Sequence, residues 1–406
     1  MVEPMSESTR TQELGEARHD VIVVGSRCAG AATAMLLARQ GLDVLVVDRA
    51  TFPSDTLSTH AIARSGVVQL SRWGLLDAVV ASGAPEIRKV TFHLADGRVL
   101  EKTVKDRAGV DVLLAPRRHV LDTILASAAV EAGAELRTGL TVTDVVTDGA
   151  GRVAGVTARA ADGTTRELRA RFVVGADGLR SRIARAVGAG MIDERPAVGA
   201  AHYAYVARLD GEGFEFHVGP TTLAGVFRTH EGEANVWVCS PADQGSLGAE
   251  DRTGDFLRLL RQAAPALADR VERGRITSPV RGAVGLPNHV RQAVGDGWAL
   301  VGDAGYHRDP ITGHGISDAF RDAELLARRL GQALQGETTE GEALAAYADE
   351  RHRALAPLFD VTCRLAAFPE PDEFTALQKR LSDLIEAESA WLASMPPIGR
   401  HELVAA

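Results

Sequence analysis

The chain has 406 residues, of which 45% are hydrophobic and 24% are charged, so it can bury a large core spread over more than one domain. Its net charge of −9 argues against nucleic acid or an anionic membrane surface as the main partner. Cys28, Cys239 and Cys363 lie too far apart for a redox pair or a zinc motif, and no run of eighteen apolar residues occurs. We therefore expect a cytoplasmic protein with no metal, no nucleic-acid partner and no integral membrane association.

The chain begins with a polar segment, residues 1–18, which we interpret as a flexible tail. A strand, helix, strand unit follows: an apolar strand over Asp20–Val24, a helix of small residues over Ala29–Arg39, and a second strand over Val44–Val47. Such a unit is typical of dinucleotide-binding proteins.

The turn between the first strand and the helix contains residues suited to binding a dinucleotide. Gly25 permits a tight turn, Gly30 lets the helix approach the sheet, and the helix N-terminus offers free N–H groups to a pyrophosphate. Asp48 ends the second strand, where an acidic side chain accepts hydrogen bonds from an adenosine ribose. Arg27 replaces the middle glycine of the fingerprint; turned outward, it would add positive charge near the diphosphate.

Further along, strand-like segments at 90–94 and 99–104 precede a helix over 117–132. The Gly-rich segment 149–155 resembles a second dinucleotide loop. Alternating residues flank it at 141–147 and 153–159, so we interpret it as the turn of a β-hairpin. Without a second nucleotide-binding unit, a nicotinamide donor would have to bind transiently.

Two later motifs complete the pattern. A buried strand over Phe172–Gly178 ends in Gly-Ala-Asp-Gly and leads into a helix over Leu179–Val187. Another strand, Trp298–Val301, delivers Gly302-Asp303 to its carboxyl end, where open α/β sheets bind ligands. The segment 310–315 then starts a helix over Ile316–Leu334, whose N-terminus suits the negative edge of a reduced flavin. The ordered trio of motifs therefore indicates a flavin site.

Between and after these motifs, segments 198–209, 214–218, 224–228 and 235–239 alternate as strands of a second sheet. Helical periodicity over 340–365 and 374–392, broken at Pro369 and Pro371, predicts C-terminal helices. Their amphipathic faces favour packing against the body or a homodimer contact over a membrane anchor.

The trio resembles the para-hydroxybenzoate hydroxylase fold of FAD-dependent flavoproteins, which includes aromatic hydroxylases, flavin halogenases and geranylgeranyl reductases. Segments 52–60 and 302–323 look most like actinobacterial FAD-dependent oxidoreductases. The resemblance implies an α/β fold: a Rossmann-like FAD-binding domain (19–88, 106–190 and 282–335), an inserted, mainly antiparallel β-sheet substrate domain (89–105 and 191–281), and a C-terminal helical region (336–406).

The resemblance also implies non-covalent FAD. An arginine followed by leucines contacts the flavin in this fold; Arg118, with Leu121 and Leu125, matches it, and Arg117 is a rival. The candidate cofactor residues are Gly25, Arg27, Cys28, Ala29, Gly30, Asp48, Arg49, Arg117, Arg118, Asp177, Gly302, Asp303, Pro310, Gly313, His314, Gly315 and Ile316.

The resemblance favours a monooxygenase that hydroxylates or epoxidises a small aromatic or polyketide-like molecule with molecular oxygen, through a flavin C4a-hydroperoxide. Electrons would come from NAD(P)H or from a separate reductase. The alternatives are a geranylgeranyl reductase-like enzyme acting on a C=C bond, a halogenase, and a non-catalytic flavoprotein. His60 and His314 could exchange protons near neutral pH, and Pro310 is the third catalytic candidate. The candidate substrate walls are Tyr203, Tyr205, Phe216, Phe227 and Trp237.

Overall fold

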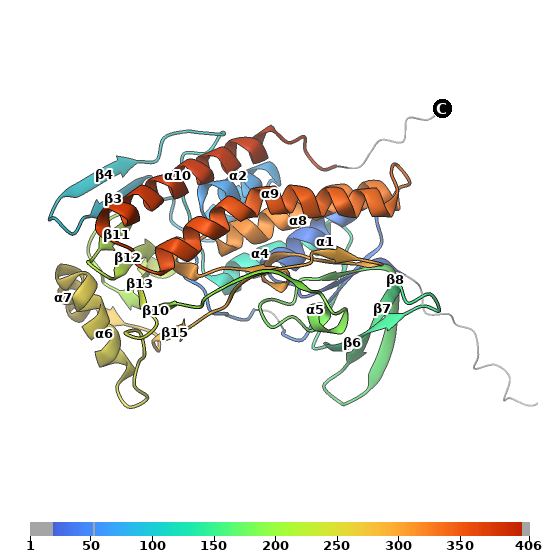
Figure 1. The fold of residues 1–406 in the computed structure, drawn as a ribbon, viewed down its shortest axis with the longest axis horizontal. Coiled ribbons are helices and arrows are strands. Elements are labelled where there is room, and N and C mark those ends of the chain that lie inside the picture. The colour runs from blue at the N-terminus through green and yellow to red at the C-terminus, as the bar shows by residue number, and fades with distance from the viewer. Residues whose placement is uncertain (1–18, 52, 400–406) are drawn as a thin grey trace, which may run out of the picture.

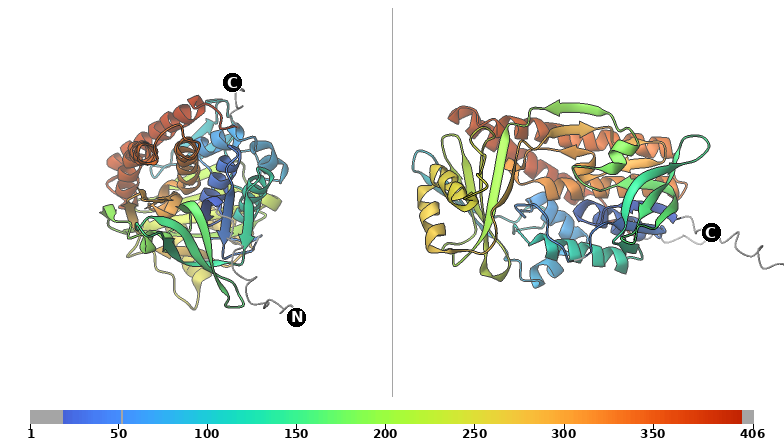
Figure 2. Two further views of the ribbon diagram at one scale, coloured as in Figure 1. Left: turned by 90° about the vertical axis from the view of Figure 1, so that its right-hand side faces the viewer. Right: turned by 90° about the horizontal axis from the view of Figure 1, so that it is seen from below.

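The computed structural model describes residues 19–51 and 53–399, so the predicted tail at 1–18 lies outside the described residues. The molecule is elongated (Figures 1 and 2). Helices α6 (Arg252–Ala263) and α7 (Pro265–Arg273) lie at one end, and the hairpin of β6 (Thr141–Thr147) and β7 (Val153–Arg159) lies at the other. The predicted α/β class, with a Rossmann-like unit, an additional β-sheet and C-terminal helices, is confirmed.

The first sheet has the strand order β17-β18-β8-β1-β2-β5. Its strands β18, β8, β1, β2 and β5 are parallel, which brings their carboxyl ends to one edge. The bounds are β1 His19–Val24, β2 Val44–Asp48, β5 Glu135–Thr138, β8 Thr165–Gly175, β17 Val294–Gly295 and β18 Trp298–Leu300.

Alternation along β1 explains how both faces of this sheet are covered. Val21 and Val23 pack in the core with helices α1 (Cys28–Ala38), α4 (Arg118–Glu131) and α8 (Gly315–Leu334). Ile22 and Val24 pack on the opposite face with the hairpin β6 (Thr141–Thr147) and β7 (Val153–Arg159) and with helix α5. The hairpin prediction is thus confirmed.

The second sheet has the order β14-β10-β13-β12-β11-β3-β4, with β15 also paired to β10. It is antiparallel except where β11 meets β3. The bounds are β3 Lys89–His93, β4 Val99–Thr103, β10 Gly199–Ala207, β11 Phe214–Val218, β12 Leu223–Arg228, β13 Ala234–Pro241, β14 Arg275–Ile276 and β15 Arg281–Val284. Because β15 spans residue 282, the sheet crosses the predicted domain boundary.

Helices cover both faces of the second sheet. Apolar side chains on one face pack with α6 (Arg252–Ala263) and α7 (Pro265–Arg273). The other face packs with the C-terminal helices α9 (Glu340–Ala366) and α10 (Pro371–Ser394). Figure 1 shows these two helices lying along the body and reaching from one sheet to the other.

Three features depart from the expectations drawn from sequence. The helix predicted at 179–187 is only the short α5 (Arg182–Ala186), because the chain first turns through 178–181. Helices α2 (Arg64–Arg72) and α3 (Leu76–Ala81), and also α6 and α7, occupy segments for which no helix was predicted. A small third sheet joins β9 (Met191–Arg195), β16 (Asn288–Arg291) and β19 (Tyr306–His307). Within residues 19–51 and 53–399, no helix has the length and apolar character needed to cross a bilayer.

Candidate active site

The glycine turn after β1 has no space for side chains. Gly25 has a φ of +104°, and a Cβ there would overlap the carbonyl of Ala176. A Cβ on Gly30 would overlap the backbone of Gly25, and one on Gly302 would lie 3.0 Å from the Cβ of Ala29. The three motifs, far apart in sequence, therefore meet around the N-terminus of α1.

Asp48 is anchored from this turn. Its Oδ2 accepts hydrogen bonds from the backbone N and the hydroxyl of Ser26, both at 2.7 Å, and Oδ1 accepts one from the N–H of Ala50 at 2.8 Å. The carboxylate is therefore fixed at the carboxyl end of β2, with lone pairs left for ribose hydroxyls. Arg49, the next residue, is exposed.

The structure adds a residue that sequence reasoning missed: Asp122, a fully buried carboxylate on α4. It accepts hydrogen bonds from Arg27 at 3.0 Å, from Arg118 at 3.0 and 3.1 Å, and from the Cys28 thiol at 3.2 Å. The i, i+4 spacing of Arg118 and Asp122 on one helix was the available signal. Asp122 thus holds two arginines beside the glycine turn.

Two side chains in this group have altered acidity. Burial raises the pKa of the Cys28 thiol, so the sulfur stays protonated and unreactive at neutral pH. Burial opposes the charge of Arg118, but attraction from Cys28, Asp122 and Asp303 leaves its pKa raised. Because the Cys28 thiol is neutral, we attribute the attraction to the two carboxylates.

Asp303 is exposed to solvent although the surrounding protein desolvates its carboxylate, and this burial is the main reason why its pKa is raised. In the turn that leads into α8, the Thr312 hydroxyl is buried and, among the described residues, lacks a hydrogen-bond partner. A carboxylate after β18, an unsatisfied hydroxyl and a glycine cradle fit the ribityl and diphosphate groups of FAD.

In the structure, the Asp177 carboxylate contacts the first turn of α5. Its carboxylate accepts hydrogen bonds from the backbone N–H groups of Arg182, at 2.6 Å, and Ile183, at 3.3 Å, and from the Ser181 hydroxyl. It therefore caps α5, so its predicted contacts with cofactor, which stay a prediction, would have to use the remaining lone pairs or the backbone.

A short turn, η4 (Pro310–Thr312), leads into α8. Asp309 caps this turn, and Gly313 has a φ of +62°, a conformation that favours glycine. Gly315 and Ile316 form the first turn of α8, where N–H groups have no partner within the helix, and Gly302 lies against Ala319 of the same helix. The His314 side chain is buried, and its Nε2 lies 2.8 Å from Glu388 of α10. His314 is thus paired with the C-terminal region.

Beneath this turn lies a buried ion-pair network. Arg321 donates hydrogen bonds to Asp318 at 2.7 Å, to Asp322 at 2.9 Å and to Glu388 at 3.0 Å. Asp322 also pairs with Arg351 of α9 and accepts the N–H of Gly302 at 3.2 Å. The network therefore ties the Gly-Asp motif to α8, α9 and α10.

The predicted substrate walls come together on the inner face of the second sheet. Tyr203, Tyr205, Phe227 and Trp237 are at most 4% exposed. Phe216 joins them: its ring centroid lies 5.6 Å from that of Phe227 and 5.8 Å from that of Trp237.

The FAD-binding part reaches this face through His60 and Arg117. His60 has a φ of +69°, hydrogen-bonds through Nε2 to the Tyr205 hydroxyl, and stacks on that ring with centroids 5.5 Å apart. The Arg117 guanidinium lies 3.6 Å from the centre of the same ring and pairs with Glu233 at 2.9 Å. The two neighbouring arginines therefore have different partners: Arg118 pairs with Asp122 on its own helix, and Arg117 lies on the sheet residue Tyr205.

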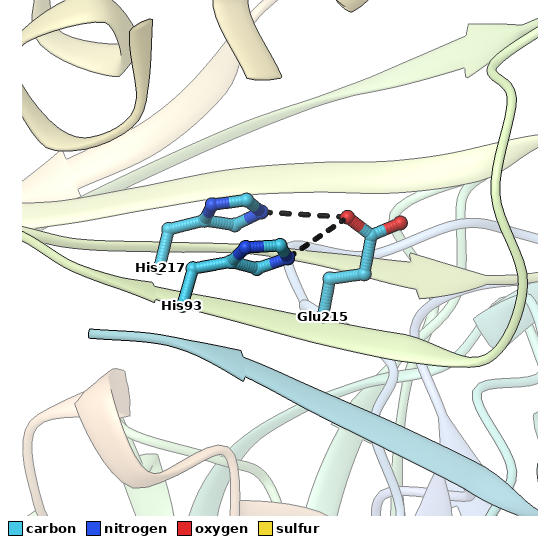
Figure 3. A group of neighbouring side chains, drawn as sticks. All are labelled: His93, Glu215 and His217. Carbon is cyan, nitrogen blue, oxygen red and sulfur yellow. Dashed lines mark hydrogen bonds and ion pairs between the residues drawn. The ribbon is translucent and has the colours of Figure 1, made fainter. Parts of the chain in front are cut away.

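A second polar group lies on the outer face of the sheet. Figure 3 shows His93 and His217 stacked, both with Nε2 toward Glu215 at 4.0 and 3.4 Å. Such a trio resembles a set of metal ligands. However, Arg270 binds the Glu215 carboxylate in a bidentate pair at 2.6 and 2.9 Å. This guanidinium already supplies the positive charge, so we interpret the group as an ion pair that holds α7 on the sheet.

Comparisons with known proteins agree with this geometry. Two relatives are digeranylgeranylglycerophospholipid reductases of Methanopyrus kandleri. Reductase 1 is 29% identical over 92% of this chain and 99% of its own length, and reductase 2 is 30% identical over 81% of each.

Among solved structures, the flavin-dependent brominase Bmp2 is 20% identical, with a TM-score of 0.77 over 92% of this chain and 94% of its own. PqsL, a probable FAD-dependent monooxygenase from Pseudomonas aeruginosa, is 23% identical, with a TM-score of 0.73 over 91% and 100%. These likenesses show the fold. The FAD binding domain model matches residues 18–362, and the chain therefore belongs to this family of FAD-dependent oxidoreductases.

Proposed function

We propose that this oxidoreductase is a monooxygenase that hydroxylates or epoxidises a small aromatic or polyketide-like molecule. The observation that carries the proposal is the contact of His60 and Arg117 with Tyr205, where an aromatic sheet face meets the cofactor-binding part. Bound FAD would supply the activation of oxygen. The chain itself would contribute the buried aromatic and hydrogen-bonding side chains of this sheet face.

At this junction, His60 and Tyr205 are neutral hydrogen-bonding groups. Burial, reinforced by the charges of Arg118 and Arg117, lowers the pKa of His60 well below its ordinary value, so the imidazole is neutral at pH 7. Burial likewise raises the pKa of Tyr205, which keeps its phenol protonated. Two neutral groups that share a hydrogen bond can orient a substrate hydroxyl by hydrogen bonding without placing a charge in the buried site.

A solved neighbour supports the substrate class. PqsL was crystallised with 2-aminobenzoylacetate, a small aromatic compound, and shares the fold over almost its whole length. Its identity to this chain is 23%, so the neighbour supports an aromatic substrate in general, not this compound.

The electron donor in this proposal is NAD(P)H, bound transiently, with a separate reductase as the other route. Reduction can then be gated by substrate. We expect NAD(P)H oxidation to rise at least about tenfold with the right compound, because about 1.4 kcal/mol of preference for a reducible flavin position suffices. The assay is NAD(P)H oxidation with a panel of phenols and aromatic ketones. If neither nicotinamide reduces the flavin under any condition, a separate reductase must be the donor.

A second candidate function is reduction of a C=C bond, and it is favoured by the two reductases that are 29% and 30% identical to this chain. The two functions differ in their need for oxygen. Anaerobic assays with dithionite-reduced protein and a geranylgeranyl ether lipid separate them: saturation of the lipid without oxygen supports the reductase. Product that forms only with oxygen supports the monooxygenase.

A further inference from the structure

Two rows of side chains cross the inner face of the second sheet. Strand pairing sets Tyr205, Asn235 and Phe227 side by side in one row. The next row contains Tyr203, Trp237 and Gly225, and a Cβ on Gly225 would overlap the Trp237 ring. Asn235 is thus an amide in the middle of an aromatic wall, next to the tyrosine that contacts His60.

Asn235 is fully buried, and neither its Oδ1 nor its Nδ2 has a hydrogen-bond partner among the described residues. The same holds for Trp237 Nε1 and His60 Nδ1. Buried polar atoms are almost always paired, so several unpaired ones on one surface point to a group that binds there. Asn288 offers the contrast: equally buried, it donates to the Pro196 carbonyl at 2.9 Å and accepts from the Asp309 N–H at 2.6 Å.

We propose that Asn235 and Trp237 form a polar subsite that selects an aromatic substrate carrying a carbonyl beside an N–H or O–H group. The carbonyl would accept from the Trp237 indole N–H or the Asn235 amide, and the N–H or O–H would donate to the Asn235 Oδ1. The two residues alternate onto one face, roughly 7 Å apart along β13, within the span of such a molecule. The inference rests on the proposed function only in placing the substrate on this face.

The chemistry disfavours a purely hydrocarbon substrate. An isoprenoid chain on this face would leave the amide and the indole N–H unpaired, and sites with buried polar groups reject analogues that cannot pair them. The subsite should therefore bind a polar aromatic molecule in preference to the isoprenoid part of a lipid.

The first test needs no ligand. Asn235→Val should raise the Tm of the unliganded protein by at least about 1 °C, since an unpaired amide is replaced by an apolar group suited to a strand. Asn288→Val, made on another strand at an equally buried position, should lower Tm by at least about 4 °C because two hydrogen bonds are lost. A comparable fall in both variants would show that Asn235 is already paired, and would overturn the proposal.

The second test uses oxidised, FAD-loaded protein without NAD(P)H. The flavin absorbance change is titrated with ortho-aminoacetophenone and with ortho-cymene, its hydrocarbon isostere. Asn235→Val should weaken binding of the ketone at least about tenfold, while the affinity for ortho-cymene should change less than about twofold. Asn235→Thr, which has the shape of valine with a hydroxyl in place of one methyl group, should bind the ketone with intermediate affinity.

Equal losses for the two probes, or no binding of the ketone by the parent protein, would overturn the subsite. The assay involves no turnover. A protein that discriminates the probes but proves to be a reductase would therefore keep this inference and lose the proposed monooxygenase function.

Discussion

Among single residues, Asp303 offers the most direct test of cofactor binding. Replacing it with alanine removes a charge-assisted hydrogen-bond acceptor worth about 1.5 to 3 kcal/mol, so FAD affinity should fall about tenfold or more. Equilibrium dialysis of the apoprotein measures this. The control is Asp162→Ala, at an exposed position on the β7–β8 turn, which should leave FAD affinity unchanged. Unchanged affinity in Asp303→Ala would show that this carboxylate does not contact the cofactor.

Asp122 should contribute more to the stability of the apoprotein than to that of the FAD-bound protein. Asp122→Ala leaves Arg27 and Arg118 without their buried partner, which should cost about 3 kcal/mol of unfolding free energy in the apoprotein. A bound diphosphate would supply replacement negative charge, so the Tm difference from the parent should shrink at saturating FAD. Thermal melts with and without FAD test this, with Glu131→Ala on the same helix as the exposed control. A difference that FAD leaves unchanged would place the diphosphate elsewhere.

Protonation of Glu215 should cause part of the loss of folding stability at acid pH. Burial raises its pKa, but hydrogen bonds from Arg270 and His217 lower it to about 2 overall. A carboxylate with a depressed folded-state pKa stabilises the fold above its unfolded value, near 4.3, and that stabilisation is lost as pH falls toward the folded value. About 1.2 kcal/mol should disappear between about pH 6 and 3.5.

Urea unfolding of the parent protein and of Glu215→Gln across this pH range tests the point. The glutamine variant should be less stable at neutral pH but should show a pH dependence flatter by about that amount. Parallel profiles for the two proteins would mean that the Glu215–Arg270 pair does not contribute to acid sensitivity.

At the scale of single residues, the sequence predicted local features better than partners. Gly25 and Gly30 could be identified because the tight turn and the close helix contact demand glycine. The pairing of Arg27 with Asp122 joins residues 95 positions apart, and that of His314 with Glu388 joins residues 74 apart. Such contacts depend on how elements pack, so no local pattern indicates them.

At the scale of elements, α10 holds the loop that precedes α8. Glu388 pairs with His314 and Arg321, and both partners lower its pKa despite the opposing effect of burial. Glu388→Ala should therefore cost about 3 to 5 kcal/mol of unfolding free energy. It should also speed amide hydrogen exchange in the first turn of α8.

Glu386 is the matched control two residues earlier on α10. It pairs with Arg64 and Arg107 near the surface, so Glu386→Ala should cost at most about 1 kcal/mol. Similar losses for the two variants, or no change in exchange at residues 315–318, would mean that α10 does not hold the loop.

Elements with a strong period were predictable, and those that depend on distant pairing were not. The β6–β7 hairpin follows from alternation around a glycine turn. Helix α6 carried an overlooked signal, a capping Asp251 followed by Phe256, Leu259, Leu260 and Ala263 at helical spacing. The third sheet pairs β16 with β9 and β19 through short segments, and pattern alone does not select such partners.

In the whole molecule, the loop residues His60 and Arg117 contact Tyr205 of the second sheet, and α9 and α10 pack on the same face of that sheet. The aromatic face that we propose for substrate binding is thereby bordered by distant parts of the chain. The sequence predicted the order of the three cofactor motifs because each is local. It could not predict that the C-terminal helices pack on this face of the second sheet, since an amphipathic pattern does not indicate which surface the apolar side will contact.

A monooxygenase inserts an oxygen atom into its product, and mass spectrometry detects that atom directly. The products are formed from NAD(P)H, FAD-loaded protein and a responsive aromatic substrate under isotopically labelled oxygen gas. We expect one labelled oxygen atom per product molecule and no product without oxygen. A product that instead gains two hydrogen atoms and forms equally well without oxygen would contradict the proposed monooxygenase function.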